Sequence, residues 1–265
     1  DWLEHRVEVP QALHDFSWSD DAIHRVWLAE ALNLCLFRKL VDAVPDGLRY
    51  VDEQHESGRK VVFDHGAIRT VDWVQNGELP RGRLAFSRLL EPLGFTDVRT
   101  YPLTKLNMTG WGYRQMDLPE DIAQFFVSEL HPGRLSEAFQ NAVSRVVGSS
   151  RDPLSHEDLS ILKRLQSTRH CSLEEATRLL PNLYRAFGRQ HGVVREDDYR
   201  QLLSESAEMA WISTEGNSFN HLTDRVENLE ATVEEQIRRE RPMKDSIEVS
   251  GSGRVMQTAY KACTV

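Results

Sequence analysis

An internal repeat constrains the fold of this 265-residue chain more than any other feature. A β-branched run over residues 61–71 predicts a strand, and a helix is predicted over 83–93, where Gly94 stops it. Three further extended runs complete this first unit, at residues 96–101, 111–117 and 125–130. After Gly216 the order returns, with a strand, a helix and two strands predicted at 217–226, 227–240, 247–250 and 254–262. The repeat predicts two similar β-α-β-β-β modules, of which the second lacks its fourth strand.

We therefore predict an α+β fold with a helical insertion between two modules. The parts are an N-terminal helical segment, a first βαβββ module, a helical insertion and the start of a truncated second module, at residues 1–50, 51–134, 135–213 and 214–265. The N-terminal segment contains an amphipathic helix over about 20–44, with Ser19 as its candidate cap. The insertion is expected to begin with a helix over 135–147 and to end with one over 196–211.

The insertion also contains two sequence signatures of helix starts. Ser155 with Asp158 and Ser172 with Glu175 have the spacing of a capping box, in which a hydroxyl and a carboxylate satisfy backbone N–H groups. Pro181 is expected to break or kink the second of these helices, because proline lacks the N–H that an interior helical position donates.

The composition of the chain limits the classes of partner and the cellular location that we expect. Lys and Arg number 32 against 41 Asp and Glu, a net charge of −9, which argues against nucleic-acid and anionic-membrane partners because both require a basic patch. No run approaches the roughly eighteen apolar residues of a membrane span, and no secretory signal is visible. Cys35, Cys171 and Cys263 are too far apart for a disulfide framework or a zinc cluster. These features predict a cytoplasmic protein of unknown oligomeric state.

The two modules share a motif, His-x-x-x-Arg, on their opening strands. Its copies run from His65 to Arg69 and from His221 to Arg225. Because residues i and i+4 of a strand share a face, each module presents an imidazole and a guanidinium about 13 Å apart. If the modules close around one cavity, the two histidines converge; imidazole suits iron, zinc or copper, and arginine offers a fork for a carboxylate. We predict that His65 and His221 bind one divalent metal ion.

Simpler explanations exist for single members of the motif. A lone histidine on a strand is more often a hydrogen-bonded core or surface residue than a metal ligand, and Arg69 could equally form a structural salt bridge. The chain has 10 histidines, and most of those outside the motif are expected at the surface, namely His5, His14, His24, His55, His131, His156, His170 and His191.

A mononuclear iron centre also needs a carboxylate ligand. Glu129, on the predicted fourth strand of the first module, is a weak candidate within the chain. The equivalent position of the second module falls beyond Val265, where we expect the third ligand, a Glu. Because the chain also begins without Met, we expect it to be a fragment of a longer protein.

Four stretches resemble the 2-oxoadipate dioxygenase/decarboxylase family, also called hydroxyglutarate synthase. They are VFDHGAIRT around His65, FFVSELH around Glu129, WISTEGNSFNHLTDRV around His221 and PMKDSIEVSGSG after Arg241. The resemblance spans nearly the whole chain, and the stretch around His221 is its most specific part.

This resemblance implies a fold of the vicinal-oxygen-chelate type, with paired βαβββ modules and a helical insertion. It implies conversion of 2-oxoadipate and O2 to (R)-2-hydroxyglutarate and CO2, a step of lysine catabolism, with Fe(II) as cofactor. The family's metal-binding histidines correspond to His65 and His221, and its substrate-binding arginine corresponds to Arg69. Its metal-binding glutamate belongs to the fourth strand of the second module, which lies beyond Val265.

Two other functions stay open at this point. One is a non-oxidative isomerase or lyase of the same fold that uses zinc, nickel or cobalt as a Lewis acid. The other is a metal-free binding protein that keeps the modules without the site. Oxygen consumption distinguishes the first from a dioxygenase, and metal analysis distinguishes the second.

Overall fold

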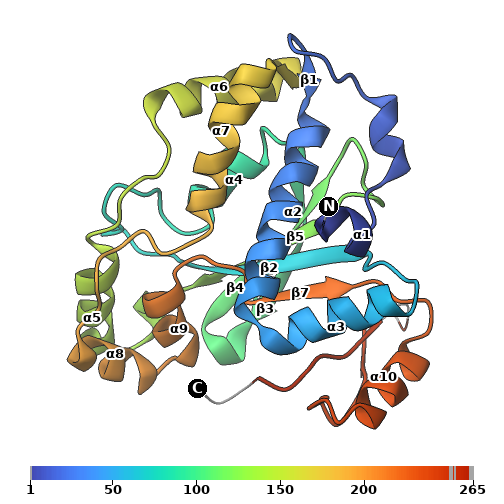
Figure 1. Ribbon diagram of the computed structural model, residues 1–265. Helices are drawn as coiled ribbons and strands as arrows, with labels where there is room; N and C mark the ends of the chain where they lie inside the picture. Colours follow the sequence, from blue (N-terminus) through green and yellow to red (C-terminus); the bar gives the residue numbers. More distant parts are fainter. Residues whose placement is uncertain (1, 251–252, 254, 263–265) are drawn as a thin grey trace.

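The computed structural model describes residues 2–250, 253 and 255–262, and a mixed five-stranded sheet lies at its centre (Figure 1). The first module supplies four of the strands, β2, β3, β4 and β5, at Phe63–Val71, Phe95–Leu103, Met108–Gln115 and Gln124–Leu130. Helix α4 (Leu84–Leu90) follows the opening strand, so the predicted β-α-β-β-β order is confirmed. The fifth strand, β7 (His221–Asp224), opens the second repeat, and the sheet order is β3-β4-β5-β2-β7.

The second repeat departs from the first after its helix. Helix α10 (Leu229–Arg238) follows β7 as predicted. The strands predicted at 247–250 and 254–262 are reduced to β8 (Glu248–Val249) and β9 (Met256–Gln257), which pair in a separate two-stranded sheet. All four of their residues are exposed, so no apolar face anchors this hairpin to the main sheet. Residue 254 of the predicted strand, like Cys263, lies outside the described residues.

Helices cover the sheet from the N-terminal segment and from the insertion. The N-terminal helices are α1 (Trp2–Arg6), α2 (Arg25–Ala43) and α3 (Pro45–Glu56). The insertion contains α5 (Glu137–Val147), α6 (His156–Thr168), α7 (Leu173–Ala186), α8 (Glu196–Leu203) and α9 (Ala207–Glu215). Short 3₁₀ helices lie at Gln11–Asp15, Thr104–Leu106 and Pro132–Arg134. None of the described helices is long and apolar enough to cross a membrane.

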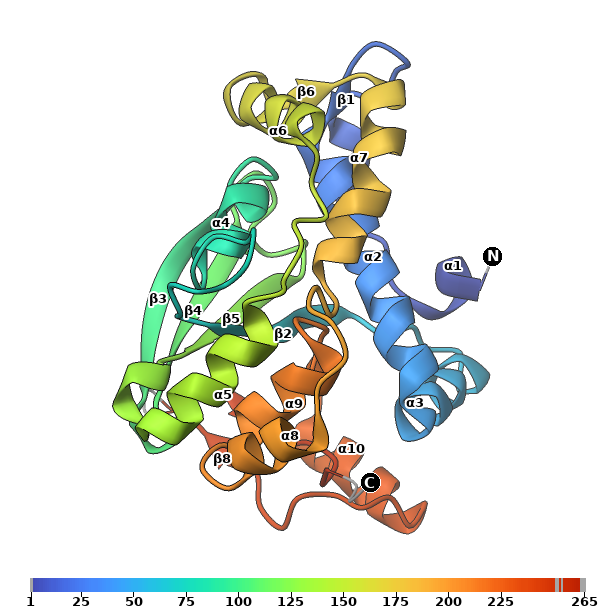
Figure 2. The same cartoon turned by 90° about the vertical axis from the view of Figure 1, so that its left-hand side faces the viewer.

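Two hydrophobic clusters hold these layers together. The larger one joins α2, α4 and α7 to one face of the sheet through fully buried residues such as Leu32, Ile68 and Leu179. The smaller one packs α5, α8 and α9 against the ends of β2 and β5 on the other face, around Phe139. Figure 2 shows α2 and α7 side by side, with α5, α8 and α9 grouped at one end of the sheet.

Local signals located some helix boundaries correctly and others wrongly. Both predicted capping boxes are present, at the starts of α6 and α7. Pro181 does not break α7, and the fully buried Leu179 and Leu183 beside it show how packing outweighs one lost backbone hydrogen bond. The cap of α2 is His24, whose Nδ1 accepts from the Val26 amide. The Ser19 hydroxyl instead accepts from the Ala22 amide in the turn before β1 (Ile23–His24).

The helix predicted over 196–211 is two helices instead. The chain leaves helical geometry after Leu203, and the Ser206 hydroxyl accepts a hydrogen bond from the amide of Met209 to start α9. A serine cap of this kind satisfies backbone groups that a continuous helix would have paired itself.

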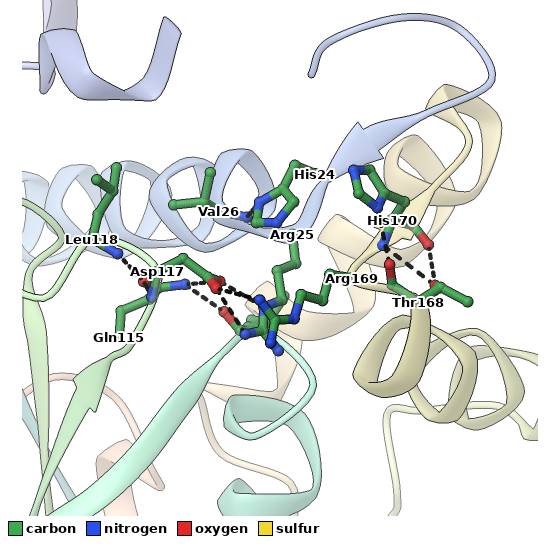
Figure 3. A network of polar contacts seen from close by, with 10 residues as sticks. His24, Arg25, Val26, Gln115, Asp117, Leu118, Thr168, Arg169 and His170 are labelled. Atoms are coloured by element: carbon green, nitrogen blue, oxygen red, sulfur yellow. Dashed lines mark hydrogen bonds and ion pairs between the residues drawn. The ribbon is translucent and has the colours of Figure 1, made fainter. Parts of the chain in front are cut away.

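Charged side chains hold the junction between α2, the sheet and the insertion (Figure 3). Asp117, after β4, accepts hydrogen bonds from Arg25 at 2.6 and 3.0 Å, and Arg169 lies 3.7 Å away. Burial acts to raise the pKa of Asp117, but the hydrogen bonds from Arg25 and Gln115 have the larger combined effect and lower it. His170 belongs to β6 (His170–Cys171), which pairs antiparallel with β1 and so joins the insertion to the N-terminal segment.

Candidate metal centre

The two histidines of the repeated motif lie on one face of the neighbouring strands β2 and β7. In the antiparallel register His65 is opposite Thr223 and His221 is opposite Ala67, so both imidazoles point to the same side. Their ring centroids are 5.7 Å apart and their planes make an angle of 89°. Two imidazoles bound to one ion through nitrogens about 2 Å from it have centroids within about 6 Å of each other. The spacing of the pair therefore suits a shared ion.

Hydrogen bonds at Nδ1 orient both imidazoles. Nδ1 of His65 lies 2.8 Å from a carboxylate oxygen of Asp64, and Nδ1 of His221 lies 2.7 Å from the amide oxygen of Asn220. Because both partners are acceptors, each Nδ1 carries the proton and each Nε2 presents a lone pair. On His65 the Thr223 hydroxyl lies 3.2 Å from that Nε2 atom. An oxygen acceptor behind the imidazole is the usual support of a metal-binding histidine.

The electrostatic surroundings favour a neutral His221 and an ionised Asp64. Although the residue His221 is exposed by its surface area, neighbouring groups desolvate its ring, and this effect, followed by the charges of His65 and Arg69, lowers its pKa to about 4. The hydrogen bond from His65 is the main cause that lowers the pKa of Asp64, against the effect of burial. A cation binds the neutral form of imidazole, so His221 is in the required protonation state at neutral pH.

The two arginines of the motif differ in their contacts. Arg225 donates to Asp64 at 2.8 Å and to the carbonyl of Glu120 at 3.1 Å, so the expectation that both arginines offer open forks is wrong for Arg225. The cause is local, because β7 ends one residue earlier and the register with β2 shifts beside it. The guanidinium of Arg69 lies over the ring of Trp211, 5.2 Å from its centroid. Among the described residues no carboxylate lies within ion-pair distance of Arg69, which argues against the salt-bridge explanation for it.

Glu129, the weak candidate for the third ligand, lies elsewhere. In the parallel register of β2 and β5 it is aligned with Thr70, which points to the face opposite His65. Its carboxylate accepts the backbone N–H of Arg83 at 2.6 Å, and a Cβ on Gly82 (φ +53°) would collide with it. The interpretation of Glu129 as a ligand beside the histidines is therefore wrong.

No carboxylate that the structure describes completes a three-residue group with either motif histidine. The glutamate expected beyond Val265 stays a prediction.

A family model described as 2-oxoadipate dioxygenase/decarboxylase matches residues 34–265. The chain belongs to this family. A comparison with curated proteins finds no significant match.

The fold of this chain is similar to those of several solved structures. A protein assigned to the glyoxalase superfamily, from Ralstonia eutropha JMP134, is 50% identical, with a TM-score of 0.95 over 100% of this chain and 82% of the other. The hydroxyglutarate synthase from Pseudomonas putida, in complex with 2-oxoadipate, is 16% identical, with a TM-score of 0.68 over 87% of this chain and 56% of the other. The corresponding complex from Oryza sativa is 13% identical, with a TM-score of 0.66 over 91% and 75%. The α+β fold of the vicinal-oxygen-chelate type, predicted from the repeat and the resemblance, is confirmed.

The family's fold also holds a polar group that sequence reasoning missed. Asp72, Glu129 and His131 each offer a ligand atom, and these atoms lie within 4.8 Å of one another. His131 belongs to the histidines of which most were expected at the surface, but its side chain is only 16% exposed and its Nδ1 lies 3.0 Å from Asp72. Of the same eight histidines, His24 and His191 are buried. Only the parallel register of β2 and β5 brings Asp72, Glu129 and His131 together, and no local sequence signal reveals that register.

This second group is compatible with a metal, but its residues already have protein partners. Arg81 forms an ion pair with Asp72, and the Thr109 hydroxyl lies 2.8 Å from Nε2 of His131. Burial is the main cause that raises the pKa of Glu129. The positive charge of Arg81 therefore already balances the carboxylate of Asp72 at the position that a metal ion would occupy.

Proposed function

We propose that the protein is an Fe(II)-dependent dioxygenase that oxidatively decarboxylates 2-oxoadipate with O2 to (R)-2-hydroxyglutarate and CO2. The observation that carries this proposal is the convergence of His65 and His221, each held at Nδ1 by a protein acceptor, on the strand face that also bears Arg69. Among the described residues no ion pair occupies the Arg69 guanidinium. The family match supports the reaction class, and the relatives crystallised with 2-oxoadipate support the substrate.

In this proposal His65 and His221 are two of the metal ligands, and the glutamate predicted beyond Val265 is the third. Two imidazoles and one carboxylate are the ligand set of non-haem iron(II) oxygenases, and they leave coordination positions open. Bound iron(II) would supply activation of O2 next to a chelating 2-oxo acid. Asp64 and Asn220 hold the protons on Nδ1, so that Nε2 of each imidazole would be the atom that binds the ion.

Arg69 binds the substrate carboxylate remote from the keto group. Its planar fork matches a carboxylate with two parallel hydrogen bonds, and its partial burial strengthens them. The reaction consumes one 2-oxoadipate and one O2. The bond between the first carboxylate and the keto carbon breaks, the keto carbon becomes the new carboxylate, and the carbon next to it gains the hydroxyl. We place this step in lysine catabolism, as the resemblance implies, and the protein in the cytoplasm, as its composition predicts.

Oxygen uptake with 2-oxoadipate tests the proposal. Anaerobically iron-loaded protein is expected to consume O2 and release CO2 in a ratio of one to one and to form 2-hydroxyglutarate. Protein carrying His65→Ala, treated identically, serves as the control and is expected to be inactive. Product formation without O2 uptake would contradict a dioxygenase.

A second candidate function has an observation of its own in its favour. The 50%-identical relative is assigned to the glyoxalase superfamily, which favours a metal-dependent isomerase or lyase of the same fold that works without oxygen. Turnover of a 2-oxo acid under strict anaerobiosis, with zinc, nickel or cobalt in place of iron, would support this candidate. A metal-free binding protein is the third possibility, and a protein that takes up none of these metals would support it.

A further inference from the structure

The side chain of Arg69 lies between the sheet and the last helix of the insertion. Arg69 belongs to β2, whereas Trp211, the aromatic ring below its guanidinium, belongs to α9. The backbone is bound from the same direction, since the side-chain amide of Asn217 donates to the carbonyl oxygen of Arg69 at 2.6 Å. The insertion thus reaches the strand that also bears His65.

Arg69 contacts the face of the Trp211 indole, with its guanidinium carbon 5.2 Å from the ring centroid. Cation–π contact and hydrogen bonding engage different parts of a planar guanidinium. Within the described residues, no ion pair or side-chain hydrogen bond occupies the N–H groups of Arg69. A second pair in the chain behaves differently, because Arg83 lies 5.0 Å over the ring of Trp111 while donating to Asp97 at 3.2 Å. The first pair is the one whose fork is left open.

A competing carboxylate lies one turn earlier on α9. Glu208 is three residues before Trp211, so both side chains project from the same side of the helix. Burial is the main cause that lowers the pKa of Arg69, and the charge of Glu208 acts against it. Without the indole, a turn of the guanidinium toward Glu208 would close the fork with an internal ion pair.

We propose that Trp211 is a positioning residue for Arg69, and that its indole face keeps the guanidinium edge open to a substrate carboxylate and away from Glu208. This inference rests on the proposed function, in which Arg69 binds the remote carboxylate of 2-oxoadipate. It makes the helical insertion a determinant of substrate recognition.

The position of Arg69 is measured first, without metal or substrate. In the NMR spectrum the Nε–H signal of Arg69, identified by its loss in Arg69→Lys, is expected to be shifted by the indole ring current. Trp211→Phe retains a ring and most of this shift, whereas Trp211→Leu abolishes it. An unchanged Arg69 signal in Trp211→Leu overturns the positioning role, whatever the protein's activity.

Kinetics with two substrates of equal chain length then test recognition. For 2-oxoadipate, Trp211→Leu is expected to raise KM about three- to thirtyfold, the worth of one cation–π contact, with a smaller change in kcat. For 2-oxohexanoate, which lacks the remote carboxylate, KM stays unchanged, and Trp211→Phe stays near the unaltered protein for both. Trp111→Leu is the matched control and leaves the ratio of the two KM values unchanged. Equal increases of KM for both substrates in Trp211→Leu overturn the inference, because they indicate general loss of structure.

A double variant tests the role of Glu208. Adding Glu208→Gln to Trp211→Leu removes the competing charge and is expected to restore much of the KM for 2-oxoadipate; no restoration overturns the competition. If the unaltered protein does not distinguish 2-oxoadipate from 2-oxohexanoate, the substrate assignment fails, and the NMR measurement still decides the position of Arg69.

Discussion

The two imidazoles of the candidate centre differ in the group that orients them. A carboxylate, Asp64, supports His65, whereas a neutral amide, Asn220, supports His221. A carboxylate behind an imidazole makes the imidazole a stronger donor than an amide does. His65 is therefore expected to contribute more to metal affinity than His221, and Asp64 is expected to act on the metal through it.

Substituting Asp64→Asn tests this indirect effect. The variant removes the negative charge behind His65 and is expected to weaken iron(II) binding about 10- to 100-fold, as measured by anaerobic titration calorimetry. Asp64 also pairs with Arg225, so Arg225→Gln is the matched control that breaks the same ion pair without touching His65. An equal loss of affinity in both variants would assign the effect to the ion pair and contradict the support of His65.

Arg69→Lys tests the fork proposed for the substrate. Lysine keeps the positive charge but loses the bidentate geometry, so KM for 2-oxoadipate is expected to rise about tenfold or more while metal affinity is retained. Steady-state kinetics and metal titration on the same preparation separate the two effects. Unchanged kinetics would argue that Arg69 does not touch the substrate.

Helices and strands could be predicted from the sequence where neighbouring residues determine them. The aromatic and β-branched runs of β2 and β5 predict strands by themselves, and the serines before α6 and α7 predict their caps. The predicted helix and strand boundaries were wrong where contacts between residues far apart in the sequence determine them. Pro181 is tolerated because of packing, and the helix after residue 196 ends early because Ser206 caps a new one. Near the C-terminal end the predicted strands are reduced to the exposed pair β8 and β9, and among the described residues an isolated bridge between Met243 and Tyr260 adds to their pairing.

Helix α2 contains a buried carboxyl that makes stability depend on pH. Burial raises the pKa of Glu30, which is 7% exposed, to about 8 from 4.5. The unfolded chain ionises this group at about pH 4.5 and the folded chain only near pH 8. The free energy of unfolding therefore falls as pH rises between these values, by an amount on the order of 4 kcal/mol from this group.

Glu30→Gln is expected to remove this loss. Urea unfolding at pH 5 and pH 8 should show the variant gaining stability relative to the unaltered protein at the higher pH. Glu227→Gln, at an exposed loop position, is the control and should show the same difference at both pH values. A constant difference for Glu30→Gln would mean that Glu30 ionises normally in the folded protein.

At the scale of the whole molecule, the repeat predicted that His65 and His221 lie close together, and they do because the opening strands of its two copies are neighbours. The antiparallel pairing of β2 and β7 converts two motifs 156 residues apart into one pair of facing imidazoles. The repeat could not predict that Arg225 is used internally, since that depends on a register shift beside Phe63. The group around Asp72 was equally unpredictable, because it depends on the alignment of β2 with β5.

Metal titration of single-histidine variants tests the central claim, that His65 and His221 bind one ion, most directly. Iron(II) or cobalt(II) is titrated anaerobically into the unaltered protein and into His65→Ala, His221→Ala and His131→Ala. One ion is expected to bind, and the first two variants are expected to lose most of the affinity. His131→Ala, which alters the group of Asp72 and Glu129, is expected to retain it. Retained affinity in both His65→Ala and His221→Ala, with loss in His131→Ala, would contradict the claim and locate the metal at the other end of β2.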